Sequence, residues 1–185
     1  VVTLYVFVMG ILNRLLIDPL GVYEGISDYY INQFLSTLGQ ASWYSSYMTV
    51  VLPLGMFGFW YFKNVYLRIL TGFFTLIGFA TLVTQNTDSA YFGFLAAMLV
   101  LFHVSVADAK KMQRLFEVAL LFALAPKFMW FLLKIHPNEI LELDAISEMF
   151  VFAGWTWALI PLCAAFLVLF WALDKKGTYP VRAMR

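Results

Sequence analysis

Long apolar runs separated by short polar connections constrain this chain more than any other feature. An α-helix needs about 20 predominantly apolar residues to cross the hydrocarbon core of a bilayer. Six runs approach that length, at 1–16, 43–62, 65–83, 90–106, 115–133 and 149–173. The sequence therefore predicts an all-α fold, a polytopic transmembrane helix bundle of about six spans in a single domain, 1–185.

The first run is shorter than the others. As a helix, 1–16 measures about 24 Å, against a hydrocarbon core of about 30 Å. We therefore expect that the first span begins upstream and that the sequence is a fragment of a larger bundle.

Composition supports the membrane class and narrows the chemistry. Hydrophobic residues make up 63% of the chain and charged residues 12%, whereas soluble domains have roughly 45–50% and about 25%. The single cysteine, Cys163, lies in an apolar run, so neither a disulfide framework nor a thiolate metal site is expected. No glycine-rich nucleotide loop or His-Glu-x-x-His motif is present. We expect a lipid bilayer as surroundings, and no metal, cofactor or nucleic-acid partner.

The charged residues divide between the two sides of the predicted bundle. Basic residues occupy the connections after the second and fourth runs and the tail, at Lys63, Arg68, Lys110, Lys111, Arg114, Lys175, Lys176, Arg182 and Arg185. The other connections are mostly acidic and hold only Arg14 and Lys134 as basic residues. Because basic loops stay in the cytoplasm, we expect both ends of the chain inside and the loops 17–42, 84–89 and 134–148 outside.

The polar turn 36–42, just before the second run, has two interpretations. In the first, Ser42 caps the helix, and Trp43 and Tyr44 are anchors at the membrane surface. In the second, the donor-rich turn, including Gln40, holds an anion such as a lipid phosphate at the helix N-terminus.

Few ionisable residues fall inside or beside the runs. Lys127 either extends outward along its apolar stem or faces the bundle and neutralises an anionic headgroup. Asp88 either caps the fourth span or binds a partner. Glu117 lies one turn after Arg114, and the spacing indicates a local ion pair.

Three separated segments resemble the O-antigen ligase and polymerase family of bacterial membrane glycosyltransferases. They are Asp-Pro-Leu-Gly at 18–21, Ser-Thr-Leu-Gly-Gln-Ala-Ser-Trp-Tyr at 36–44 and Thr-Gln-Asn-Thr-Asp-Ser-Ala at 84–90. The sequence departs from the family pattern at Gln40, where the family has Asn, and at Asp88-Ser89, where many relatives have Ser-Arg. The large outer loop that carries the family's essential Arg and His residues would lie beyond Arg185.

The resemblance implies glycan transfer or polymerisation at the outer face of the bacterial cytoplasmic membrane. The donor would be a glycan on a polyprenyl diphosphate, and neither metal nor nucleotide sugar would be needed. Arg14, Gln40 and Lys127 are then the candidates for binding the diphosphate, and Asp88 is the candidate base. Catalytic residues, sugar, acceptor and oligomeric state stay open. A multi-span transporter and a non-catalytic membrane subunit are the alternatives.

Overall fold

The computed structural model describes residues 2–31, 36–85, 87–136, 143–177 and 179. This part of the chain is helical and contains no strand. The six longer helices are α1 (Val2–Arg14), α3 (Ala41–Tyr61), α4 (Val65–Leu82), α5 (Ser89–Ser105), α6 (Ala109–Ile135) and α8 (Leu159–Lys176). The shorter elements are α2 (Asp28–Ile31), η1 (Ser36–Leu38), α7 (Ala145–Phe152) and η2 (Gly154–Ala158). The all-α class predicted from the sequence is confirmed.

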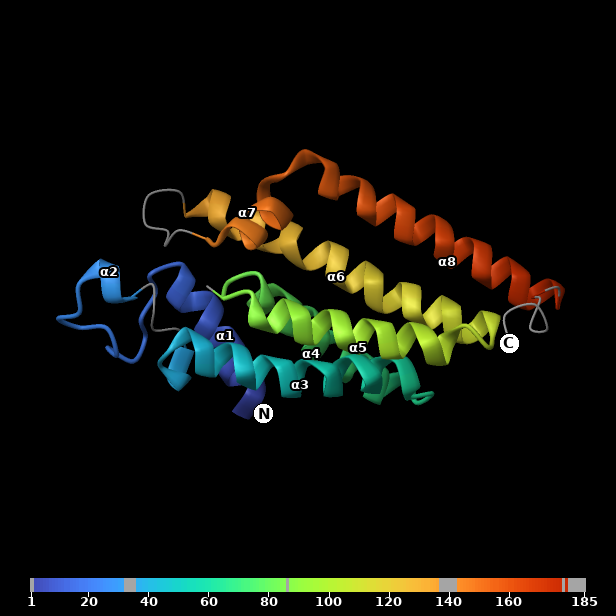
Figure 1. Cartoon of the computed structure of the whole chain (residues 1–185), viewed down its shortest axis with the longest axis horizontal. Helices are drawn as coiled ribbons and strands as arrows, with labels where there is room; N and C mark the ends of the chain where they lie inside the picture. Colours follow the sequence, from blue (N-terminus) through green and yellow to red (C-terminus); the bar gives the residue numbers. More distant parts are fainter. Residues whose placement is uncertain (1, 32–35, 86, 137–142, 178, 180–185) are drawn as a thin grey trace.

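Five of the longer helices run along the long axis of a bundle, and α1 is shorter and lies toward one end (Figure 1). Helix α6 is central, because it packs against α3, α4, α5 and α8. Helices α2 and α7 lie at the same end as the C-terminus of α1, and the described end of α8 lies at the opposite end (Figure 1).

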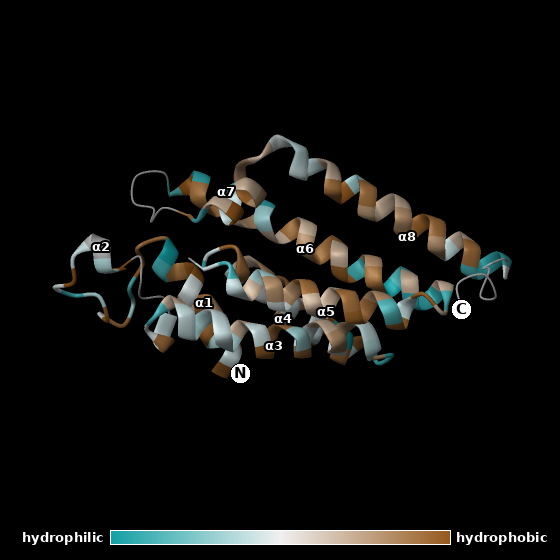
Figure 2. Ribbon diagram, in the orientation of Figure 1, coloured by the Kyte–Doolittle hydropathy of each residue, from teal (hydrophilic) through white to brown (hydrophobic). Residues whose placement is uncertain are grey.

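Within the described residues, three helical segments are long and apolar enough to cross a membrane: Val65–Leu82, Ala109–Ile135 and Gly154–Lys176. The runs 1–16 and 90–106 form shorter apolar helices, of 13 and 17 residues. Hydrophobic residues occur along all the longer helices (Figure 2), and many of their side chains are exposed on the outside of the bundle as well as buried in its core. Only 11% of the apolar stretch within Gly154–Lys176 is buried. Three candidate spans are therefore established, and a bundle of about six spans stays a prediction.

The sixth run is interrupted. Positions 149–173 were expected to form one span, but α7 ends at Phe152, and the short turn η2 separates it from α8. The backbone at Ala153 is extended, with φ −64° and ψ 131°, so the helix cannot continue through it. The apolar composition of this run does not predict the break.

Two local interactions predicted from the sequence are wrong. Ser42 does not cap α3, because the helix begins at Ala41 and its N-cap position is Gln40, whose side chain makes no capping hydrogen bond. Glu117 does not pair with Arg114 but forms an ion pair with Arg68 of α4. The Arg114 side chain instead donates to the main-chain oxygens of Trp60 and Tyr61, at 2.7 and 3.1 Å.

Small residues let α1 and α4 approach α3 closely. A Cβ at Gly10 would overlap the Tyr44 hydroxyl, and a Cβ at Gly78 would lie 2.7 Å from a methyl carbon of Leu52. The Thr81 hydroxyl also donates to the main-chain oxygen of Phe7, at 3.1 Å. This close packing brings the polar ends of the three helices together.

Candidate functional site

Buried polar side chains gather where α1 ends, α3 begins and α4 ends. We call this group the polar cluster, and it consists of Asn13, Arg14, Ser36, Tyr44, Thr81, Thr84 and Gln85. Each of these side chains is buried, although most of the bundle around them is apolar. Buried polar groups are costly unless they are hydrogen-bonded, so the bonding of each member indicates its role.

Arg14 lies at the centre of the polar cluster. It ends α1 and is completely buried. Its Nε donates to the main-chain oxygen of Thr84 at 2.8 Å, and Nη2 donates to the same oxygen. The carboxylate of Asp144, the N-cap residue of α7, lies within electrostatic range of this guanidinium. Arg14 therefore ties α1 to the connection after α4 and leaves a positive charge beneath this end of the bundle.

The turn η1 is fastened to α1 by Ser36. Its main-chain N–H donates to Asn13 Oδ1 at 3.0 Å, and its hydroxyl donates to the main-chain oxygen of Val6 at 2.7 Å. Ser36 has a φ of 59°, a left-handed conformation that is uncommon for residues other than glycine. The two hydrogen bonds hold this conformation and place the start of the 36–44 segment directly on α1.

Two members of the polar cluster carry polar atoms without a partner. Gln85 is fully buried, and neither oxygen nor nitrogen of its amide forms a hydrogen bond within the described residues. Tyr44 is also fully buried. Its hydroxyl lies against Gly10 and near Thr81 but forms no hydrogen bond within the described residues. Each such atom costs about 1–3 kcal/mol. A bound polar group would recover that free energy.

A second tyrosine lies beside the cluster. Tyr23 is buried, and its main-chain N–H donates to Asp18 Oδ2 at 2.6 Å. Burial, followed by the nearby Asp18 carboxylate, raises the pKa of the Tyr23 phenol to about 12. The phenol is therefore neutral at physiological pH, and it lies within electrostatic range of Arg14.

The structure separates the four residues proposed from the sequence. Arg14 belongs to the polar cluster, whereas Gln40 and Asp88 are exposed at the starts of α3 and α5, and neither side chain makes a capping hydrogen bond. Asp88 does occupy the N-cap position that the sequence suggested. All three nevertheless lie at the same end of the bundle.

Lys127 is placed apart from the other three. Its ammonium donates to the main-chain oxygens of Phe150, Val151 and Ala153, at 3.4, 3.2 and 3.4 Å. It also donates to the Thr156 hydroxyl. Carbonyl groups at a helix C-terminus attract a cation, so Lys127 joins α6 to the end of α7. Neither interpretation drawn from the sequence anticipated these partners.

Several members of the polar cluster were missed in the sequence. Gln85 stands within the segment 84–90 but was given no separate role, and Tyr44 was considered only as an anchor at the membrane surface, in the interpretation in which Ser42 caps the helix. Thr81 lies near the end of the third apolar run and Thr84 follows that run, and polar residues are expected at the end of any span. The polar character of these residues is visible in the sequence, but only the structure shows that their side chains are buried.

Comparisons with protein-family models, with curated proteins and with solved structures find no match to this chain. Within the described residues, no group of three or more His, Cys, Asp or Glu side chains is placed to hold a metal ion. The polar cluster and the three sequence segments are therefore the features from which we infer a function.

Proposed function

We propose that this chain is part of a polytopic glycosyltransferase of the O-antigen ligase and polymerase type in the bacterial cytoplasmic membrane. The end that contains the polar cluster faces outward and binds the diphosphate of a polyprenyl-linked glycan. One observation carries the proposal: the segments 36–44 and 84–90, recognised separately in the sequence, are both bonded to the end of α1, Ser36 to Asn13 and Thr84 to Arg14.

The bonding within the polar cluster supports binding of an anionic, hydrogen-bonding group. The Gln85 amide and the Tyr44 hydroxyl offer donors, and the positive charge of Arg14 acts through a medium of low dielectric. A diphosphate leaving group gains negative charge as the glycosidic bond breaks. Donors already fixed in place stabilise that charge.

Access to the buried groups requires a movement. Gln85 and Tyr44 are completely covered, so a diphosphate reaches them only when a surface turn shifts. The turn η1 is the candidate, because two hydrogen bonds from Ser36 fasten it to α1. We propose that η1 moves away when the diphosphate binds, and that the diphosphate then covers Gln85 and Tyr44 in place of this turn.

The test uses Gln85→Met, which keeps the length of the side chain and removes its amide. The chain is reconstituted in lipid nanodiscs, and binding of undecaprenyl diphosphate is measured by native mass spectrometry. We expect Gln85→Met to weaken binding by about tenfold or more, the loss typical of a hydrogen bond to a charged group. The same variant should be at least as stable as the wild type, because an unpaired buried amide is removed.

The matched control is Gln113→Met, the same chemical change at the opposite end of the bundle, where Gln113 contacts Glu117. This control should bind undecaprenyl diphosphate as the wild type does. Equal binding by wild type and Gln85→Met would contradict the proposed site. A decrease of equal size in both variants would do the same.

A further inference from the structure

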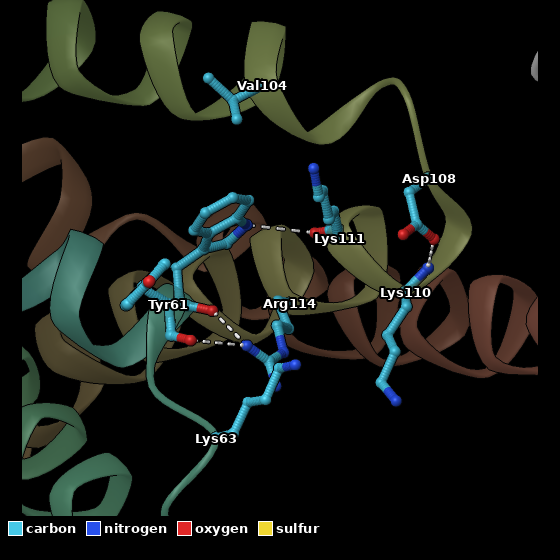
Figure 3. Close-up of a pocket in the computed structure, with 8 residues that line it drawn as sticks. Tyr61, Lys63, Val104, Asp108, Lys110, Lys111 and Arg114 are labelled. Carbon is cyan, nitrogen blue, oxygen red and sulfur yellow. Dashed lines mark hydrogen bonds between the residues drawn. The ribbon is translucent and has the colours of Figure 1, made fainter.

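A basic cavity opens at the end of the bundle opposite the polar cluster. It has a volume of ≈ 750 Å³ and lies between the end of α3, the end of α5 and the start of α6. Figure 3 shows the residues that matter for its chemistry, which are Trp60, Lys63, Asp108, Lys110, Lys111 and Arg114.

Positive charge dominates this cavity. Four basic side chains line it against the single carboxylate of Asp108. That carboxylate is already engaged, because it caps α6 by accepting from the Lys110 main-chain N–H at 2.9 Å. Lys63 and Lys111 form no ion pair within the described residues. Lys63, Lys111 and Arg114 line the same cavity, and a bound anion would reduce the repulsion between their like charges.

Hydrogen bonds fix the frame of the cavity. Arg114 binds the last main-chain oxygens of α3 through Nη1, at Trp60 and Tyr61. The Trp60 indole N–H donates to Ser105 Oγ at 3.0 Å and to the Lys111 main-chain oxygen at 3.3 Å. The ends of α3 and α5 and the start of α6 are therefore held together, and the basic side chains stand on a fixed base.

The position of the cavity along the bundle matches the depth of lipid headgroups. Tyr61, on its rim, is 70% exposed, and Tyr66 in the next helix is 83% exposed. Tyrosine and tryptophan beside lysine and arginine are typical of the boundary between hydrocarbon and water. In the orientation proposed above, this boundary belongs to the cytoplasmic leaflet, whose anionic lipids attract basic segments.

We propose that this cavity binds the phosphate of an anionic phospholipid headgroup, with Lys63, Lys111 and Arg114 around it. The inference rests on the proposed orientation in the membrane but involves the opposite end of the chain. Basic pockets between membrane helices on the cytoplasmic side suit such headgroups. A lipid held here would join the ends of α3, α5 and α6.

The test compares lipid binding by the purified full chain in detergent, measured by native mass spectrometry with dioleoyl phosphatidylglycerol and dioleoyl phosphatidylcholine. The variant Lys63→Gln/Lys111→Gln removes two charges from the cavity. Each basic residue near an anionic lipid is worth roughly fivefold in affinity. We therefore expect the wild type to prefer phosphatidylglycerol, and we expect this preference to be about 25-fold weaker in the double variant.

The control, Lys175→Gln/Lys176→Gln, removes the same charge from the end of α8, outside the cavity. It should retain the preference for phosphatidylglycerol. An equal loss in both double variants would overturn the proposal, because it would indicate general attraction to the basic surface.

Competition with inorganic phosphate distinguishes a lipid headgroup from a soluble anion as the ligand of the cavity. A lipid anchored by its acyl chains should stay bound in the presence of millimolar phosphate, and its displacement would reassign the cavity to a soluble anion. Undecaprenyl diphosphate binding should be unchanged in Lys63→Gln/Lys111→Gln. The lipid site and the polar cluster can therefore fail independently.

Discussion

Lys127 and Gln85 are both buried polar side chains, and they differ in how completely they are bonded. The Lys127 ammonium has four oxygen partners at the end of α7 and in the turn that follows it. The Gln85 amide has none within the described residues. Full bonding is typical of a structural role, whereas an unpaired buried amide is a liability that a ligand can remove. This contrast is why the proposed site contains Gln85 and excludes Lys127.

A substitution of Lys127 tests its structural role. Lys127→Met keeps the apolar stem but leaves several main-chain oxygens without their donor, so we expect it to lower the free energy of unfolding by about 2 kcal/mol. The measurement is thermal and denaturant unfolding of the chain in detergent. Lys134→Met is the control, because Lys134 is exposed and contacts only the face of Trp130 within the described residues, with 5.0 Å between Nζ and the ring centroid. Wild-type stability of Lys127→Met would contradict the structural role.

At the scale of the elements, the packing of α3 on α4 depends on positions without a side chain. A Cβ at Gly55 would overlap the Phe74 ring and lie 3.0 Å from the Thr75 hydroxyl oxygen. Gly72 on α4 is similarly close to Phe59. Small residues at such contacts let two membrane helices approach closely. This approach is needed for the polar cluster, because α4 carries Thr81 and leads into Gln85.

Gly55→Ala tests this contact. Alanine is a better helix former than glycine by about 1 kcal/mol, but forcing a methyl group into a packed interface typically costs about 1–3 kcal/mol. We expect a net loss of stability in unfolding experiments. Gly154→Ala is the control, since a Cβ there meets nothing within 4 Å, and it should change stability little. A stabilised Gly55→Ala variant would show that the contact is loose.

The apolar runs predicted some elements well and others poorly. The runs 43–62 and 65–83 agree with α3 and α4 to within two residues at each end, because length and hydropathy decide those helices. Helix α6 instead begins six residues before its run, at Ala109, where the cap from Asp108 supports a charged first turn. The end of α7 was not predictable, because it depends on the backbone geometry at Ala153 and on hydrogen bonds from Lys127, which is distant in the sequence.

The candidate site was predictable only in part, for a related reason. Arg14 stood out as one of two basic residues among acidic connections, and the structure places it at the centre of the polar cluster. Gln85 and Tyr44 did not stand out, since glutamine and tyrosine are ordinary at the edge of a membrane span. Their importance comes from complete burial without a partner, which depends on contacts between distant parts of the chain.

At the scale of the whole molecule, the two ends of the bundle differ in charge. At one end lie the α3–α4 connection, the first turns of α6 and the last turn of α8 (Figure 1), which carry Lys63, Lys110, Lys111, Arg114, Lys175 and Lys176. At the other end lie the α1–α3 and α4–α5 connections and the start of α7 (Figure 1), which hold Glu24, Asp88 and Asp144. The sequence predicted this division from loop charges alone. Because basic loops are retained in the cytoplasm, we propose that the polar cluster faces out and the basic cavity faces in. Both proposals depend on this orientation.

Cysteine labelling in intact cells tests that orientation most directly. Single cysteines are introduced at Glu24, Asp88, Lys110 and Lys176 in a Cys163→Ala background, which removes the native thiol. All four positions are exposed. We predict that a membrane-impermeant maleimide labels the first two from outside and reaches the last two only after permeabilisation. Labelling of Lys110→Cys and Lys176→Cys from outside, with protection of Glu24→Cys and Asp88→Cys, would contradict an outward-facing polar cluster.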